Sequence, residues 1–164
     1  MVRVAITLTV NKKRHELEVD TRMTLVEMLR ERLGLTGSHV GCATGNCGAC
    51  TVILSGKTVK ACCILAADAN GEDITTIEAL SSSAEELHPI QAAFVENQGL
   101  QCGFCTPGMI LSALQLLSTN PEPTEEEVRR AIAGNLCRCT GYHFIVKSIR
   151  AAGERGRGGK VSVG

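Results

Sequence analysis

The sequence predicts an α+β protein in which a β-rich N-terminal domain precedes an all-α domain of four helices. Apolar and polar residues alternate over 2–10, as in a half-buried strand, whereas apolar residues after position 87 recur at helical spacing. The 164 residues also include nine cysteines but only three Phe, one Tyr and no Trp. Two small domains with so few large rings need metals or disulfides to supplement their cores.

The N-terminal domain is predicted to span residues 1–80. Its strands are predicted from apolar and β-branched runs between turn residues; they cover 2–10, 14–19, 51–54, 58–63 and 73–80. One helix is predicted at 24–34, where Thr24 and Glu27 have capping-box spacing and Gly34 provides a stop. This order predicts one helix packed on a mixed sheet.

The C-terminal domain is predicted to span residues 87–152, after a serine-rich linker at 81–86. Residues 153–164 contain glycines and charges but no apolar face, so they are predicted to form a flexible tail, with a docking arm as the alternative. Their G-x-x-G-x-G-G pattern follows no strand, which argues against a dinucleotide-binding loop.

Four helices are predicted in the C-terminal domain from apolar spacing and from signals at the helix ends; they cover 88–98, 106–120, 123–136 and 142–152. The second is expected to have Thr106 as its N-cap and Pro107 as its first residue. The third is expected to begin with a capping box formed by Thr124 and Glu127.

Eight of the cysteines fall into two sets of four. In the first set, Cys42-x4-Cys47-x2-Cys50 is followed by a distant cysteine, which is the spacing of plant-type [2Fe–2S] centres. Zinc ribbons, the alternative, usually pair two C-x2-C units. Small residues and glycines between these cysteines let a loop wrap tightly and direct N–H groups at sulfurs.

The fourth ligand of this set is either Cys62 or Cys63. If the hairpin turns at 55–57, Cys62 lies opposite Cys50 on the same face of the sheet, and Cys63 points to the other face. A two-residue turn would shift this pairing by one position. We assign Cys62 as the ligand and interpret Cys63 as a small buried hydrophobic residue.

The second set is Cys102-x2-Cys105 and Cys137-x-Cys139, and each pair comes just before a predicted helix. Two helix N-termini directed at one centre favour an anionic cluster, so the set predicts a second [2Fe–2S] centre. The compact cysteine run of [4Fe–4S] ferredoxins is absent from the sequence. A thioredoxin-type C-x-x-C is disfavoured because no βαβ unit surrounds it.

Charge and hydropathy indicate neither a nucleic-acid nor a membrane partner. The formal net charge is +0, and no apolar run approaches the roughly 20 residues of a membrane span. The N-terminal segment alternates like a strand and lacks the pattern of a secretion signal. We therefore expect a cytoplasmic protein with reduced thiols, in which metal ligation is favoured over disulfides.

The sequence segments around the cysteines closely resemble those of a known protein family. "GCATGNCGACTV", "VKACC", "QCGFCTPGMI" and "GNLCRCTGY" resemble the small iron–sulfur subunit of molybdenum hydroxylases, the xanthine oxidase family in its three-subunit bacterial form. Similar subunits occur in carbon monoxide dehydrogenase, 4-hydroxybenzoyl-CoA reductase, and nicotine, quinoline and isoquinoline dehydrogenases. The resemblance runs from about residue 4 to 152. It departs at Cys63, where relatives often have Ser or Thr, and His143 lies in a variable stretch.

The resemblance implies a fold and a role. Residues 1–80 would form a β-grasp, plant-type ferredoxin domain, and 87–152 the family's helical [2Fe–2S]-binding domain. A large partner subunit would hold molybdopterin, often as the cytosine dinucleotide, and a medium subunit would hold FAD. Electrons would pass from molybdenum through the helical-domain cluster and the ferredoxin-domain cluster to flavin. Gln101 is expected to hydrogen-bond the pterin, and Cys139 to ligate the cluster near the pterin amino group.

The resemblance also implies a dimer of heterotrimers with no catalytic residue on this chain. Two functions other than that of an electron-transfer subunit are compatible with a cysteine-rich chain. A diffusing two-cluster carrier usually has a strongly charged docking face, which a net charge of +0 does not suggest. A zinc-stapled interaction module would be colourless, whereas iron–sulfide charge transfer absorbs visible light.

Overall fold

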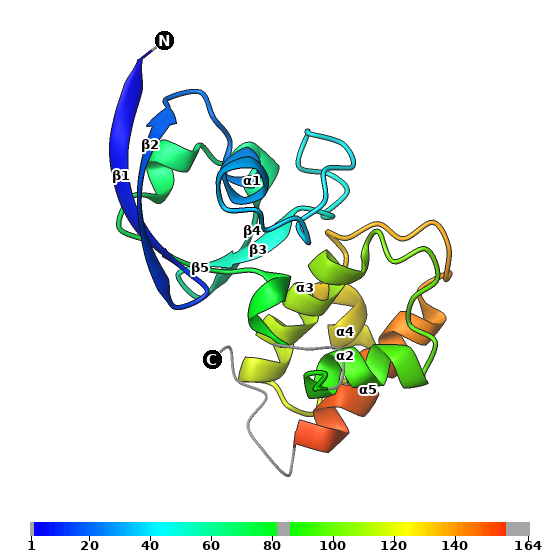
Figure 1. Ribbon diagram of the computed structural model, residues 1–164. Coiled ribbons are helices and arrows are strands. Elements are labelled where there is room, and N and C mark those ends of the chain that lie inside the picture. Colours follow the sequence, from blue (N-terminus) through cyan, green and yellow to red (C-terminus); the bar gives the residue numbers. More distant parts are fainter. Residues whose placement is uncertain (1, 82–85, 157–164) are drawn as a thin grey trace.

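Two domains lie next to each other in the molecule (Figure 1). Within residues 2–81 and 86–156, which the structure describes, five strands and one short helix come first and four longer helices follow, besides short 3₁₀ turns. The structure is a computed structural model. It confirms the α+β class and the order of the two domains, while most of the predicted linker, 82–85, lies outside the described residues.

A mixed five-stranded sheet forms the N-terminal domain, in the order β2-β1-β5-β3-β4. The strands are β1 (Arg3–Val10), β2 (Lys13–Asp20), β3 (Thr51–Leu54), β4 (Lys57–Lys60) and β5 (Asp73–Thr75). β1 runs antiparallel to β2 and parallel to β5. The first hairpin closes through Asn11 and Lys12, which both have positive φ, as a two-residue hairpin turn requires.

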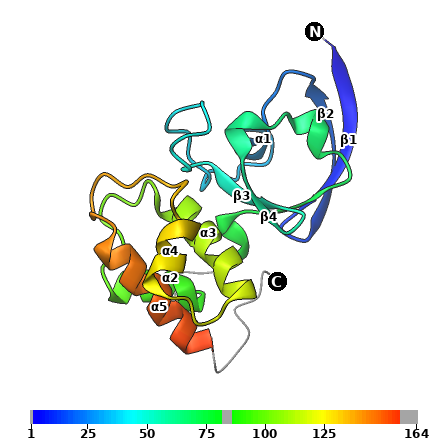
Figure 2. The same ribbon diagram turned by 180° about the vertical axis from the view of Figure 1, so that it is seen from behind.

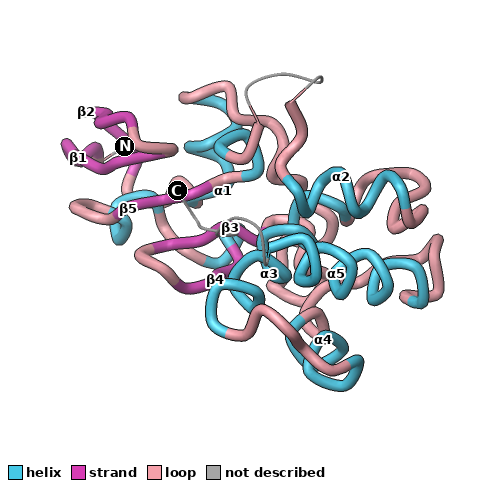
Figure 3. The backbone as a smooth tube through the Cα atoms, turned by 90° about the horizontal axis from the view of Figure 1, so that it is seen from below, coloured by secondary structure: helices cyan, strands magenta, loops and turns pink. Residues whose placement is uncertain are grey.

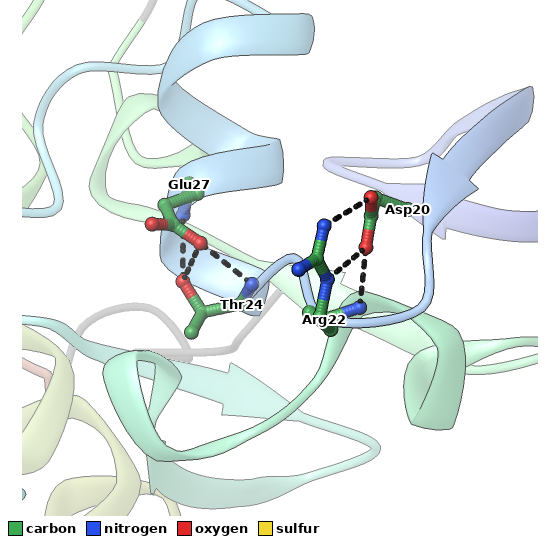
Figure 4. Close-up of polar contacts among 4 residues, drawn as sticks. All are labelled: Asp20, Arg22, Thr24 and Glu27. Atoms are coloured by element: carbon green, nitrogen blue, oxygen red, sulfur yellow. Dashed lines mark hydrogen bonds and ion pairs between the residues drawn. The ribbon is translucent and has the colours of Figure 1, made fainter. Parts of the chain in front are cut away.

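The short helix α1 (Leu25–Glu27) continues as one π-helical turn, Met28–Arg32, and covers the sheet. Thr24 begins it with the predicted capping box: the Thr24 backbone N–H donates to Glu27 Oε2 at 2.8 Å, and the Glu27 N–H donates back to Thr24 Oγ1 (Figure 4). The preceding turn contains an ion pair in which Arg22 lowers the pKa of Asp20 to about 2 through side-chain hydrogen bonds. The apolar face of α1 is buried in the sheet-domain core.

Removing this cap is expected to destabilise the N-terminal domain. Thr24→Ala deletes the hydroxyl that accepts the Glu27 N–H, so the free energy of unfolding should fall by about 1 kcal/mol. Urea denaturation followed by far-UV circular dichroism measures the loss. Thr24→Ser keeps a hydroxyl and should remain close to wild type; equal losses in the two variants would show that the methyl group, not the cap, matters.

Two predicted strands are shorter than expected. The predicted strand 58–63 is wrong beyond Lys60, because Ala61–Cys63 form a 3₁₀ turn. The predicted strand 73–80 stops before Thr76, whose N–H donates to the side chain of Asn11 instead of to a neighbouring strand. A second 3₁₀ turn, Ile77–Ala79, follows.

The C-terminal domain contains the four predicted helices. They are α2 (Pro89–Glu96), α3 (Thr106–Thr119), α4 (Glu125–Ala131) and α5 (His143–Gly156). Thr124 and Glu127 form the predicted capping box at α4. Two fully buried side chains in the core of this domain are Phe94 of α2 and Ile145 of α5.

Several helix ends differ from prediction; α4, for example, stops at Ala131, five residues before the predicted end at 136. The N-cap of α3 is Cys105, so Thr106 is already helical rather than the cap. At the other end of the domain, α5 continues to Gly156 and occupies the first four residues of the predicted tail. In this extension Gly153 packs closely against the preceding loop, since a Cβ there would lie 2.4 Å from the Pro121 carbonyl oxygen. The remainder of the tail, 157–164, lies outside the described residues.

Helix α3 joins the two domains by lying against β3 and β4 (Figures 2 and 3). Ile53 of β3 and Leu111 and Leu114 of α3 form a separate buried cluster there. The Gln115 side chain extends this contact, because it accepts from the Thr58 N–H at 2.6 Å and donates to a turn carbonyl. Among the described helices, none has both the length and the apolar character needed to cross a lipid bilayer.

Candidate iron–sulfur centres

The loop at 42–50 is shaped to surround sulfur with backbone N–H groups. Ala43, Gly45 and Gly48 have positive φ, and this turns successive N–H groups inward. The N–H groups of Thr44 and Cys47 each lie 3.4 Å from Cys42 Sγ. Hydrogen bonds from Thr44 and Cys47 lower the pKa of Cys42 to about 6, which favours the thiolate that binds iron.

The hairpin register differs from the one assumed for the fourth ligand. β3 and β4 are joined by a two-residue turn and pair Thr51 with Lys60, so Cys50 faces Ala61 rather than Cys62. The 3₁₀ turn after β4 nevertheless brings Cys62 close enough to Cys50 for the two thiols to interact. The predicted register was therefore wrong, although the 3₁₀ turn brings Cys62 next to Cys50 by another route.

Cys63 is exposed, so its interpretation as a buried hydrophobic residue is wrong. Its Sγ lies 3.6 Å from Cys62 Sγ. A Cβ at Gly45 would come within 3.0 Å of the same sulfur, so the Cys63 thiol rests on the outside of the cysteine loop.

The second set of cysteines meets between the loop that precedes α3 and the loop that precedes α5. Cys102 and Cys139 are exposed, and their sulfurs are 3.5 Å apart. Cys105 and Cys137 lie deeper and interact with each other. Burial is the main reason that the pKa of Cys105 rises to about 12, so its ionisation needs a cationic partner such as iron.

Tyr142 supports this second set. Its hydroxyl accepts from the Cys137 N–H at 2.9 Å, and its positive φ of 68° turns the chain into α5. Helix α5 therefore begins at His143, one residue after the predicted start.

The arrangement of the thiols fits two-iron clusters better than single ions. The sulfurs of Cys102 and Cys139 lie 3.5 Å apart, and Cys50 interacts with Cys62 as Cys105 does with Cys137. Each iron of a [2Fe–2S] cluster binds two of the four cysteine thiolates, as such pairs allow. Within residues 2–81 and 86–156, no group of three or more His, Cys, Asp or Glu side chains is already gathered around the position of a single metal ion.

A buried polar atom marks the inner side of the second set. Thr106 Oγ1, directly after Cys105, is buried and has no hydrogen-bond partner among the described residues. A buried hydroxyl without a partner costs about 1–3 kcal/mol, and an acceptor sulfur of a cluster at this position would relieve that cost.

Backbone contacts hold the two cysteine sets close together. The N–H of Leu136 donates to the Cys47 carbonyl at 2.8 Å. The buried Asn135 side chain donates to the Gly48 carbonyl at 3.0 Å and accepts from Ser112 Oγ at 2.9 Å. These contacts could not be predicted from local sequence patterns, since Asn135 and Gly48 are 87 positions apart.

His39 and Phe104 make a second bridge that sequence reasoning missed. Their rings stack with centroids 4.7 Å apart, and His39 Nδ1 lies 2.8 Å from the Phe104 carbonyl oxygen. His39 precedes the first cysteine set, and Phe104 lies within the C-x-x-C of the second.

Gln101 is exposed and directly precedes the exposed Cys102, whose sulfur contacts that of Cys139. The three residues therefore share one surface of the C-terminal domain. A residue on a partner protein could reach Gln101 without displacing the core.

Comparison with known families and proteins points to the same centres. Residues 8–81 match the 2Fe-2S iron-sulfur cluster binding domain, and residues 76–150 match a [2Fe-2S] binding domain. Together the two models cover both cysteine sets.

Relatives match over most of their lengths. The chain is 50% identical over 147 residues to the nicotine 6-hydroxylase small subunit of Paenarthrobacter nicotinovorans, covering 90% of this chain and 88% of that one. It is 45% identical to the nicotinate dehydrogenase small FeS subunit of Eubacterium barkeri, covering 94% and 98%. A chain of quinoline 2-oxidoreductase from Pseudomonas putida 86 superposes with a TM-score of 0.91 at 43% identity, covering 96% and 98%.

Proposed function

Because the chain belongs to the family of small iron–sulfur subunits of the molybdenum hydroxylases, we propose that it conducts electrons between two partner subunits through two [2Fe–2S] clusters. The electrons come from a molybdopterin site on a large subunit and go to FAD on a medium subunit. The ligands are Cys42, Cys47, Cys50 and Cys62 in the ferredoxin domain, and Cys102, Cys105, Cys137 and Cys139 in the helical domain.

The observation that carries this proposal is the direct link between the two cysteine sets. The hydrogen bond from the Leu136 N–H to the Cys47 carbonyl connects a ligand of one set to the residue before Cys137, a ligand of the other. An electron relay needs a short and fixed distance between its two centres. Two independent structural zinc sites would not need one.

The exposure of the thiols supports an order for the relay. Cys102 and Cys139 are exposed beside Gln101, so this end of the helical domain suits the large subunit and its pterin. Part of the loop around Cys42 is exposed on the other domain and suits the medium subunit. The proposal places both partners in the cytoplasm, in a dimer of heterotrimers, with the pterin as a cytosine dinucleotide.

Paramagnetic resonance of the reduced three-subunit complex tests the proposal. Two distinguishable [2Fe–2S] signals are expected, together with visible absorbance that bleaches on reduction. A single cluster signal, or a colourless zinc-containing protein, would contradict it.

The role of Gln101 gives a second test. Gln101→Ala is expected to change the molybdenum signal and slow turnover without removing iron, because Gln101 adjoins Cys102 but is not a ligand. Iron content and the molybdenum paramagnetic signal of the complex are the measurements. Gln98→Ala, a nearby glutamine outside the cysteine set, serves as the control. If Gln101→Ala kept wild-type turnover and a wild-type molybdenum signal, the proposed contact between Gln101 and the pterin would be refuted.

A further inference from the structure

Lys60 ends β4 with a cation that is half-buried between the two domains. Its Nζ donates to Thr51 Oγ1 at 2.8 Å. A Cβ placed on Gly134 would lie 3.4 Å from the same nitrogen, so the ammonium group also touches the segment leading to Cys137. Thr51 is itself fixed, because its hydroxyl donates to the Gly48 carbonyl at 2.7 Å. The charge therefore has a defined position and does not move freely in solvent.

Hydrogen bonds place the charge of Lys60 beside the first cysteine set. Its partner Thr51 directly follows Cys50, and Thr51 donates in turn to the carbonyl of Gly48, which directly follows Cys47. Burial lowers the pKa of Lys60, while its interactions with Cys50, Cys47 and Cys62 oppose that shift. These three are proposed ligands of the ferredoxin-domain cluster.

A cation in this position affects the two oxidation states of a cluster unequally. Reduction adds one negative charge to a group that already carries four thiolates. A nearby fixed positive charge therefore stabilises the reduced form more than the oxidised form, and net charge is among the factors that set cluster potentials. Partial burial limits screening by salt, which would weaken the same charge on an open surface.

We propose that Lys60 is a positioning residue that raises the reduction potential of the ferredoxin-domain cluster and so favours one-electron transfer into it from the helical-domain cluster. The transfer oxidises the reduced helical-domain cluster and reduces the ferredoxin-domain cluster, with no proton or bond change. The inference rests on the proposed function, because it needs both clusters in one chain.

The test is a redox titration of the three-subunit complex, followed by paramagnetic resonance. Lys60→Met keeps the length of the side chain without its charge, Lys60→Gln keeps a donor for Thr51, and Lys60→Arg keeps the charge. Lys57→Gln is the matched control, since it removes an exposed cation from the same strand. The signal that Cys47→Ser abolishes identifies the ferredoxin-domain cluster.

Both neutral variants should shift the ferredoxin-domain cluster to lower potential, and by more than they shift the helical-domain cluster. At the wild-type midpoint, the ratio of reduced to oxidised cluster should fall about tenfold, which corresponds to about 59 mV for a one-electron couple. Lys60→Arg and Lys57→Gln should keep the wild-type ratio.

Unchanged potentials in both neutral variants, or equal shifts of both clusters, would overturn the inference. Loss of the ferredoxin-domain cluster from both would also overturn it, because Lys60 would then be a structural residue. These outcomes leave the proposed function intact. Absence of two cluster signals from the wild-type complex would instead refute the proposed function.

Discussion

Replacing Cys47 with serine should remove the ferredoxin-domain cluster and stop electron delivery to the flavin. The complex should lose half of its cluster iron, and substrate should still reduce the molybdenum site while flavin reduction becomes undetectable. The physical reason is that Cys47 supplies a thiolate from the centre of the loop, where serine offers a harder and less acidic ligand. Iron analysis and stopped-flow absorbance at flavin and cluster wavelengths measure the two effects.

Cys63→Ser provides the matched control for Cys47→Ser. Cys63 is exposed on the outside of the loop, so its loss should leave iron content and flavin reduction unchanged. Cys62→Ser should behave like Cys47→Ser. If Cys63→Ser lost the cluster while Cys62→Ser kept it, the assignment of the fourth ligand would be reversed.

Gly48→Ala should separate the two domains. Gly48 has a φ of +72°, and a Cβ there would lie 2.3 Å from the Gly134 carbonyl oxygen and 2.9 Å from the Asn135 Cα. Both neighbours are backbone atoms, so no side-chain rotation relieves the overlap. We expect a loss of about 2–5 kcal/mol in the free energy of unfolding, from backbone strain and overpacking together. Chemical denaturation measures it.

Gly56→Ala isolates the contribution of the backbone conformation. Gly56 has a similar φ of +79°, but a Cβ there would meet nothing within 4 Å. It should cost about 1 kcal/mol, the strain of a left-handed residue alone. Slower electron transfer between the clusters is expected only in Gly48→Ala. Equal destabilisation of the two variants would show that the domain contact contributes nothing.

Local signals in the sequence predicted much of the fold. The capping boxes at Thr24 and Thr124 involve residues three positions apart, so the whole pattern can be recognised in a short stretch of sequence. The apolar face of α3 is equally local, and Leu111 and Leu114 are buried as their spacing indicates. The cysteine spacings that predicted the two sets, C-x4-C-x2-C, C-x2-C and C-x-C, are local in the same way.

The hairpin register could not be predicted in the same way. It depends on whether the turn has two or three residues, and Ser55 adopts a positive φ of 44° that is uncommon for a residue other than glycine. The turn has two residues instead of three, and Cys62 lies in a 3₁₀ turn outside the β3–β4 pairing. Long-range contacts such as His39 with Phe104 were equally hidden, since nothing within either segment specifies its partner.

The glycine contacts between the domains have a consequence for how this chain can vary. Gly48 and Gly108 meet so closely that a Cβ on Gly108 would lie 2.3 Å from the Gly48 carbonyl oxygen. Main-chain atoms, rather than side chains, therefore set the spacing of the two redox centres. Outer surfaces can be remodelled to suit different enzymes and substrates while the interval that each electron crosses stays constant.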